Sequence, residues 1–203
     1  MHLSVVPLTD AHVRLEPLLE AHREPLRPLA DDLASWQVTS MRADGEHFDP
    51  WFDGILASAA AGRIQPYAVW SEAHGTWAGH TAYVSIVPEH ARTEIGSTWY
   101  GPGFRGTQVN PACKRLLLAH AFDAGALRVE LKTHILNTHS QRAMEKLGAT
   151  REGVLRSHMA TWKGPRRDSV YYAILAEEWP AVRAGLDARL GDSSVVPVVR
   201  RAV

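Results

Sequence analysis

The sequence predicts an α+β protein whose central mixed, mostly antiparallel sheet carries helices on both of its faces. Short runs with strand-like alternation occur along the chain, and several of them are joined by tight turns, which is typical of antiparallel hairpins. Stretches with helical periodicity lie between other strands, and a strand–helix–strand crossover requires parallel neighbours. Together these observations indicate a sheet of mixed direction.

The first half of the chain supplies strands and two helical stretches. Helices are expected near 20–35 and 48–61, the second beginning at Asp49-Pro50, a capping residue followed by proline. A polar, irregular segment, 36–47, separates them. The strands expected in this half are 12–16, 67–70, 77–84 and 94–100, with a turn at His74-Gly75 between the second and third.

The second half alternates strands and helices. Asn110 is expected to cap a helix over 112–124, with Pro111 at its first position, where the missing N–H costs nothing. A shorter helix opens at Asn137 and ends at Gly148. The remaining elements expected are a strand at 127–133, a hairpin of strands 154–163 and 170–175, and a last helix that starts at Glu178-Trp179-Pro180 and runs to about Leu190. We therefore expect one domain over 1–190, followed by a loose tail over 191–203.

The composition argues against several classes of protein. Lys and Arg (22) balance Asp and Glu (22), so overall charge points to neither nucleic acid nor a membrane as partner. No apolar run approaches the roughly 18 residues of a membrane span, and the first residues do not resemble a signal peptide. The single cysteine, Cys113, fits a reducing cytoplasm, and the scattered histidines predict no metal site.

The segment from Arg105 to Asn110 is a basic, turn-forming loop between a strand and a helix. The free N–H groups of the first helical turn and the positive end of the helix dipole favour an anion there. The loop lacks the Gly-Lys-Ser/Thr ending of a Walker motif and the glycine pattern of a Rossmann fold. The sequence thus predicts a phosphate-binding loop of another kind.

The order and spacing of several short motifs resemble the GNAT superfamily of acetyl-CoA-dependent N-acetyltransferases, and more narrowly its RimJ/RimL-like branch. The resemblance covers roughly residues 10–185. The motifs are Glu94-Ile95-Gly96, Arg105 to Asn110, Ala121-Phe122, Arg128-Val129-Glu130-Leu131, Asn137-x-x-Ser140-x-Arg142, Glu145-Lys146-Leu147-Gly148-Ala149, Glu152-Gly153-x-Leu155-Arg156, Arg167-Asp168-Ser169-Val170-x-Tyr172 and Glu178-Trp179.

This resemblance implies a binding site for acetyl-CoA, the acetyl donor, without a metal. Backbone groups of the strand before the loop would bind the acetyl and pantetheine part, the loop would bind the pyrophosphate, and Asn137 would contact the pantetheine arm. The coenzyme-binding residues so implied are Thr98, Trp99, Tyr100, Arg105, Gly106, Thr107, Gln108, Val109, Asn110, Asn137 and Ser140. Gln108 and Asn110 stand where the family has small residues, and glycine there would let the backbone approach a phosphate more closely.

The resemblance also suggests catalytic residues. Ser140 resembles the residue that hydrogen-bonds the coenzyme sulfur and protonates the thiolate; the alternative is a hydroxyl on the first turn of a helix capped by Asn137. Glu94 could activate the amine through water; the alternative is a salt-bridged strand carboxylate. His158 and His80 are further candidate bases, and Cys113 is read as a small buried residue.

The function expected is direct transfer of an acetyl group from acetyl-CoA to a primary amine in a ternary complex. The acceptor could be a protein N-terminus, an amino acid or a small amine. The alternatives are a non-catalytic or altered acyl-CoA-binding or sensing module that keeps the fold, and a transferase for another acyl group such as succinyl, which would need an extra basic residue near the acyl group. The oligomeric state, monomer or homodimer, stays open.

Overall fold

The computed structural model describes residues 1–191, and within them it places eight strands and six α-helices. The strands are β1 (Leu8–Thr9), β2 (Val13–Pro17), β3 (Gln65–Ser71), β4 (Thr76–Val87), β5 (Arg92–Tyr100), β6 (Arg128–His134), β7 (Thr150–Ala160) and β8 (Arg166–Leu175). The helices are α1 (Arg23–Ala30), α2 (Leu33–Trp36), α3 (Phe48–Ala60), α4 (Val109–Asp123), α5 (Thr138–Leu147) and α6 (Trp179–Leu190).

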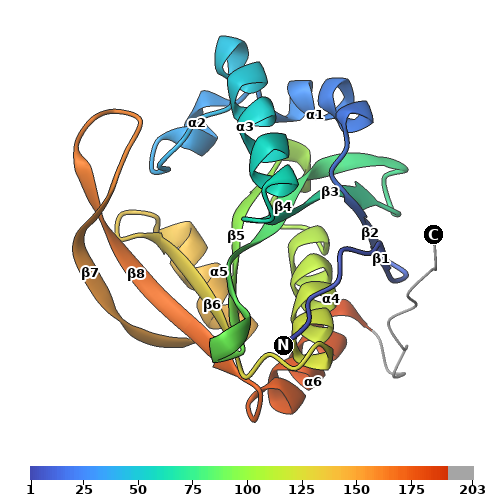
Figure 1. The fold of residues 1–203 in the computed structure, drawn as a ribbon. Helices are drawn as coiled ribbons and strands as arrows, with labels where there is room; N and C mark the ends of the chain where they lie inside the picture. The colour runs from blue at the N-terminus through green and yellow to red at the C-terminus, as the bar shows by residue number, and fades with distance from the viewer. Residues whose placement is uncertain (192–203) are drawn as a thin grey trace.

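All eight described strands form one sheet in the order β1-β2-β3-β4-β5-β6-β8-β7 (Figure 1). Only β5 and β6 pair in parallel, across the crossover that contains α4, and the other described pairs are antiparallel. The mixed, mostly antiparallel sheet is therefore confirmed. The second crossover, through α5, does not give parallel neighbours as expected, because β8 inserts between β6 and β7.

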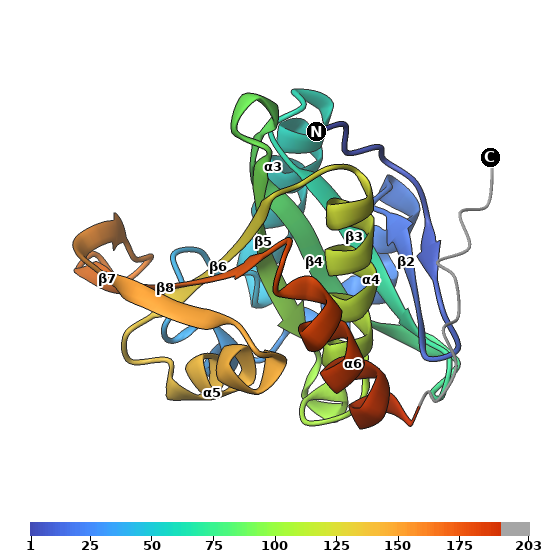
Figure 2. The ribbon, with the colours of Figure 1, turned by 90° about the horizontal axis from the view of Figure 1, so that it is seen from below.

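Helices cover both faces of the sheet, and each face has its own apolar core (Figure 2). On one face α4 and α6 pack together, and Leu116 and Leu117 of α4 share a core with Tyr83 and Tyr172 of the sheet. On the other face α1, α2 and α3 enclose a smaller core rich in aromatic side chains. That second core contains Trp36, Phe48, Trp51, Phe52 and Trp99.

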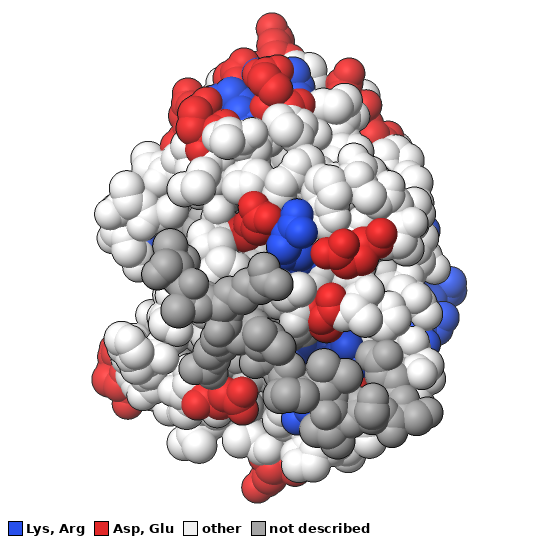
Figure 3. Space-filling view, turned by 90° about the vertical axis from the view of Figure 1, so that its right-hand side faces the viewer, with Lys and Arg blue, Asp and Glu red and all other residues white. Residues whose placement is uncertain are grey.

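Ion pairs join α1 to α3 on the outside of the molecule. Arg23 and Arg27 of α1 both bind the carboxylate of Asp49 on α3. The two guanidinium groups also lie over the rings of Phe52 and Phe48, at 4.5 and 4.8 Å from the ring centres. Charges of both signs gather in this region, at the top of Figure 3. These contacts hold the helical cap over the second core.

The predicted helix near 20–35 is two separate helices in the structure. α1 ends at Ala30, and Asp32 then caps α2 by accepting from the N–H of Ala34. α3 begins at Phe48, as the range near 48–61 predicts, but Asp49 is not its cap, because a short 3-10 turn over 45–47 already leads the chain into helical geometry. Asp49 therefore binds arginines instead of capping.

The start of α4 also differs from the prediction. The helix begins at Val109, so Asn110 and Pro111 lie inside its first turn. The oxygen of Asn110 accepts from the hydroxyl of Tyr100 at 3.3 Å, and Thr107 accepts from the N–H of Val109. Pro111 is tolerated there because the first four N–H groups of a helix have no partner inside it.

The strands are longer than expected at several ends, since pairing extends beyond the segments that alternate. β7 and β8 begin at Thr150 and Arg166, four residues before the predicted starts, and the two-residue β1 was not predicted. Asn137 caps α5 and Gly148 ends it with φ of +91°, both as expected. No helix in 1–191 is long and apolar enough to cross a membrane. The expected tail beyond Gly191 lies outside the described residues.

Candidate active site

The two parallel strands separate soon after they meet. β5 pairs with β6 only from Arg92 to Glu94, opposite Arg128 to Glu130. Beyond these residues β5 pairs with β4 alone, and β6 pairs with β8 alone. The facing edges, 95–100 and 131–134, thus have backbone groups directed at each other without strand pairing. An extended ligand between the strands could bond to them as an added strand does.

A bulge between β4 and β5 sets the direction of the next side chains. The register shifts between His80 and Ala82, and Ser97 adopts a φ of +50°. Gly79 has a φ of +156°, and a Cβ there would lie 2.2 Å from the carbonyl oxygen of Trp99. The tight contact is possible only with glycine. After the bulge, Thr98 contacts α4 while Trp99 packs against Trp36 and Trp51 on the opposite face.

The loop before α4 presents unpaired backbone donors. Gly106 adopts a φ of +75°, which suits glycine, and the residues beside it are largely exposed. Within residues 1–191, the N–H groups of Gly106, Thr107 and Gln108 have no hydrogen-bond partner. They precede a helix of 15 residues, whose positive end lies here. Successive free N–H groups at a helix start form an anion cradle.

Gln108 takes an ordinary helical conformation, with φ of −72° and ψ of −9°. Its backbone therefore does not need the freedom of the glycine that the family pattern would put there. Its side chain belongs to an exposed residue. The N–H of Gln108 is thus one of the unpaired donors, in a conformation that any residue can adopt.

Arg105 is directed away from the cradle. Its guanidinium donates to the carbonyl oxygen of Tyr100 at 3.1 Å and to the carboxylate of Asp32 at 2.7 Å, and it also contacts Ser35. The hydrogen bond from Arg105 lowers the pKa of Asp32. In this conformation Arg105 fastens the loop to α2 instead of pointing at the anion site.

Asn137 and Ser140 are brought together at the start of α5. The side-chain oxygen of Asn137 accepts from the N–H of Ser140 at 3.1 Å. Within the described residues, the amide nitrogen of Asn137 and the hydroxyl of Ser140 have no hydrogen-bond partner. Capping and ligand binding are therefore compatible, because each uses different atoms of these two side chains.

Glu94 is buried where the two strands separate, and its carboxylate pairs with Lys132 of β6. The distance between Lys132 Nζ and Glu94 Oε2 is 2.5 Å. The carboxylate lies over Gly96, where an added Cβ would come within 2.9 Å of Glu94 Oε1. The salt bridge that one interpretation of Glu94 expects is present, and it uses Oε2, while Oε1 has no hydrogen-bond partner within the described residues. No hydrogen bond between described residues joins Glu94 to Ser140.

Lys114 is a buried cation beneath the same strand. Its ammonium group donates to the hydroxyl of Thr98 at 3.0 Å, and that hydroxyl also bonds to Thr81. Burial lowers the pKa of Lys114 to about 8. Neither Lys114 nor Lys132 stood out in the sequence. The alternation of β6 could have placed Lys132 and Glu130 on one face, but their partners depend on the register with β5.

Burial shifts the pKa values of the other candidate bases, His80 and His158, and of Cys113. His80 is fully buried between Trp51 and Trp99, its Nδ1 bonds to the carbonyl oxygen of Ser97, and burial lowers its pKa to about 4. The ring of His158 lies 3.0 Å from the hydroxyl of Ser169. Burial lowers the pKa of His158, and the positive charge of Lys132 lowers it further. Burial raises the pKa of Cys113 to about 12, which agrees with a small buried residue.

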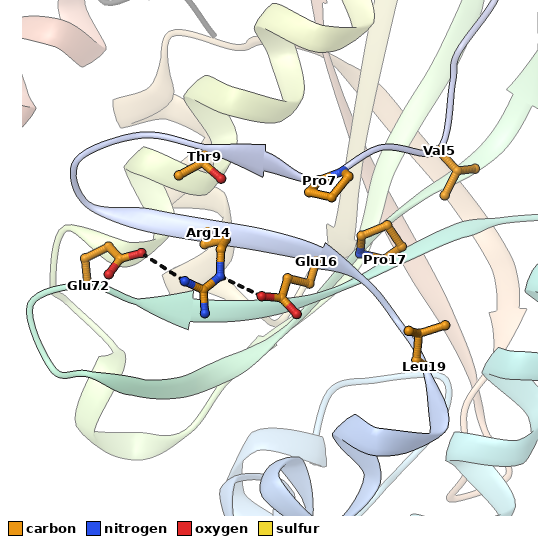
Figure 4. A pocket seen from close by; sticks show the side chains of 8 residues that line it. All are labelled: Val5, Pro7, Thr9, Arg14, Glu16, Pro17, Leu19 and Glu72. Carbon is orange, nitrogen blue, oxygen red and sulfur yellow. Dashed lines mark hydrogen bonds and ion pairs between the residues drawn. The ribbon is translucent and has the colours of Figure 1, made fainter. Parts of the chain in front are cut away.

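A surface pocket of about 530 Å³ lies elsewhere, along β1 and β2 (Figure 4). Arg14 lines this pocket and is paired with Glu16 and Glu72, at 2.6 and 3.7 Å. None of the predicted site residues lines this pocket. Among the described residues, no three His, Cys, Asp or Glu side chains are grouped to hold a metal ion.

The site combines three features: parallel strands that separate, an anion cradle at the start of α4, and polar side chains at the gap. This combination defines an acyltransferase that uses a phosphate-bearing donor. Residues 12–150 match the family model described as "Acetyltransferase (GNAT) domain". The chain belongs to this family of acyltransferases, which use acetyl-CoA as donor.

Solved structures support this assignment. A protein from T. thermophilus, described as "putative acetyltransferase", is 35% identical with a TM-score of 0.85, and the match covers 94% of this chain and 100% of that chain. A GCN5-related N-acetyltransferase from Brucella melitensis is 30% identical with a TM-score of 0.82, covering 91% and 85%. Mycobacterium smegmatis RimJ, solved with CoA-disulfide, shares the fold at 24% identity and a TM-score of 0.73, covering 92% and 93%. No curated protein sequence matches the chain.

Proposed function

We propose that this protein transfers an acetyl group from acetyl-CoA to a primary amine, by direct attack within a ternary complex. The observation that carries this proposal is the pairing of two features: the open edges of β5 and β6, and the unpaired N–H groups at 106–108. The first suits the extended pantetheine arm and the second suits a pyrophosphate. The domain that performs this reaction spans 1–190 in the proposal.

The donor site would use mostly backbone groups. The loop from Arg105 to Asn110 would hold the pyrophosphate, chiefly through the unpaired N–H groups of 106–108. Backbone groups of Thr98, Trp99 and Tyr100 would bind the acetyl and pantetheine part. The free amide nitrogen of Asn137 would contact the arm from the other side of the gap. Because Gln108 has a helical backbone, it can contribute its N–H like its neighbours.

The reaction needs a neutral amine, donors for the developing negative charge and a proton for the leaving thiolate. We assign the proton to Ser140, whose hydroxyl has no partner within the described residues. We assign deprotonation of the amine, through water, to Glu94 at the start of the gap. Lys132 would hold that carboxylate in place. Thiols leave readily, so Ser140 should assist the step and not be indispensable.

The acceptor is proposed as a protein N-terminus, an amino acid or a small amine. Membership of the RimJ/RimL-like branch is part of this proposal, and the structural neighbours include an enzyme described as a ribosomal L7/L12 alpha-N-protein acetyltransferase, 20% identical. A cytoplasmic location fits both the use of acetyl-CoA and a single, buried cysteine. A homodimer remains a prediction.

A second candidate donor is favoured by one observation. Lys114 places a buried ammonium group beside Thr98 on the donor strand. A cation there suits an acyl group that ends in a carboxylate, such as succinyl. Measuring kcat/KM for acetyl-CoA and for succinyl-CoA distinguishes the two donors. A higher kcat/KM for succinyl-CoA would show that succinyl-CoA, and not acetyl-CoA, is the preferred donor.

The test is acetyl-CoA-dependent thiol release with a panel of amines and N-terminal peptides. Ser140→Ala should lower kcat by about tenfold with little change in the KM for acetyl-CoA, since the hydroxyl acts on the leaving group. Thr138→Ala, which removes an exposed hydroxyl from the same helix, is the control and should behave as the wild type. Glu94→Gln should alter the acid limb of the pH–rate profile. An unchanged kcat in Ser140→Ala would remove Ser140 from the mechanism.

A further inference from the structure

Arg167 is a buried cation that forms no ion pair within residues 1–191, and Glu94, whose charge acts on it from a greater distance, is already paired with Lys132. The residue is 8% exposed. Its Nε donates to the hydroxyl of Ser169 at 3.2 Å, and its Nη2 lies 3.5 Å from the sulfur of Met159. Both partners are neutral, and within residues 1–191 the guanidinium makes no ion pair. Most of the side chain is thus removed from water without a carboxylate at ion-pair distance.

Such an arrangement is unfavourable for the protein alone. A guanidinium cannot lose its proton at any pH that proteins tolerate, so it cannot become neutral as a buried lysine can. Buried charges are ordinarily paired. The neighbouring Lys132 follows that rule, because Glu94 binds it at 2.5 Å. One carboxylate therefore faces two cations in this part of the sheet, and the excess positive charge lies on Arg167.

The sheet places Arg167 on the face opposite α4. Along β8, Val170 and Tyr172 belong to the core that contains α4, so the alternate residues Arg167, Ser169 and Tyr171 point the other way. The pyrophosphate cradle belongs to the α4 side. A coenzyme phosphate held there is therefore on the wrong face of the sheet to neutralise Arg167.

A continuous set of contacts connects Arg167 to the gap between β5 and β6. Ser169 joins it to His158 at 3.0 Å, the ring of His158 lies 5.6 Å from that of Tyr171, and Lys132 Nζ lies 5.9 Å from the same ring. Lys132 then meets Glu94. Arg167 is thus on the same polar face as the carboxylate that we assign to the amine.

The guanidinium retains N–H groups for a ligand. Nη1 has no hydrogen bond within the described residues, and it is not among the fully enclosed polar atoms that lack a partner, so it keeps contact with solvent. An arginine with free, parallel N–H groups recognises a carboxylate through two hydrogen bonds. The sulfur of Met159, which Nη2 contacts, also lies 4.0 Å from the hydroxyl of Ser40 in the 36–47 segment.

We propose that Arg167 binds a carboxylate of the acceptor, so that the acceptor is an amine that also carries a carboxylate. This inference rests on the proposed acetyl transfer and narrows its substrate class. The carboxylate can come from a free amino acid or from an acidic side chain close to a peptide N-terminus. Arg167 acts on the binding of the acceptor and not on the chemical step.

The experiment compares matched acceptors that differ only in charge. One arm uses free amino acids against their C-terminal amides, and the other uses peptides with Glu or Gln at the second position. With wild-type protein, the carboxylate member of one arm should have a kcat/KM at least about tenfold higher, and the arm that shows it identifies the source. Arg167→Gln should remove that preference mainly through KM, and Arg167→Lys should restore part of it.

Two controls separate binding from folding. Arg156→Gln removes an exposed guanidinium from the same hairpin and should keep the preference. The melting temperature of ligand-free Arg167→Gln should equal or exceed that of the wild type, because an unpaired buried charge is removed. A clear loss of melting temperature, with the preference retained, would make Arg167 a structural residue.

The remaining outcomes are also decisive. Equal kcat/KM within every matched pair would overturn the inference and leave acetyl transfer standing. Absence of transfer to every amine would defeat the proposed function instead. In that case calorimetric binding of the same pairs to the CoA complex decides the inference: selective binding of carboxylates, lost in Arg167→Gln, supports it, and equal or absent binding overturns it.

Discussion

Single buried charges distinguish this site from an ordinary sheet interior. Lys114 lies under the donor strand, and its ammonium group binds the hydroxyl of Thr98. Glu94 and Lys132 neutralise each other across the parallel strands, whereas Arg167 makes no ion pair within the described residues. Proteins retain such groups at a cost to stability, which makes each a candidate for a functional role.

Lys114 makes a testable contribution to the pH dependence of stability. Burial lowers its pKa from 10.5 to about 8, so between these values the unfolded chain binds more protons than the folded protein. The penalty is fully present below pH 8 and is relieved as the pH rises toward 10.5. Lys114→Met should therefore raise the free energy of unfolding at pH 7 by roughly 1–3 kcal/mol, and by less at pH 10.

Urea unfolding at the two pH values measures this difference. Lys146→Met, at an exposed position on α5, is the matched control and should show no pH-dependent gain. The explanation would be wrong if Lys114→Met gained the same free energy at pH 7 and pH 10.

At the scale of elements, the loop and α4 form the donor end of the site. The sequence predicted the loop, the helix after it and its anion-binding character. It misplaced the cap, because Asn110 bonds to Tyr100 and Thr107 accepts from Val109 instead. The bond of Asn110 depends on a strand residue that is ten positions away in sequence, so local capping preferences could not reveal it.

The backbone of the loop predicts which substitutions matter. Gln108 already has a helical φ of −72°, so Gln108→Gly should leave the dissociation constant for CoA within about threefold of the wild type. Gly106 has a φ of +75°, so Gly106→Ala should strain the loop and raise the dissociation constant for CoA by about tenfold or more. Calorimetric titration of both variants compares them directly. A tenfold gain in Gln108→Gly would show that the side chain obstructs the coenzyme.

At the scale of the whole molecule, the proposed donor site and the proposed acceptor site use opposite faces of the sheet. The donor cradle belongs to the face with α4, and Glu94, Lys132 and Arg167 occupy the face toward α1, α2 and α3. The order of motifs predicted the family, and the order of strands and helices predicted the mixed sheet. It did not predict the pairing of Glu94 with Lys132, or the position of β8 between β6 and β7, because both depend on long-range strand register.

The central claim is that the loop over 105–110 and the gap between β5 and β6 bind acetyl-CoA. Calorimetric titration of the whole protein with acetyl-CoA tests it most directly. We expect one molecule bound per chain, with a dissociation constant between about 1 μM and 1 mM, as is usual for enzyme substrates. Titration heats no larger than those of dilution at millimolar acetyl-CoA would contradict the account.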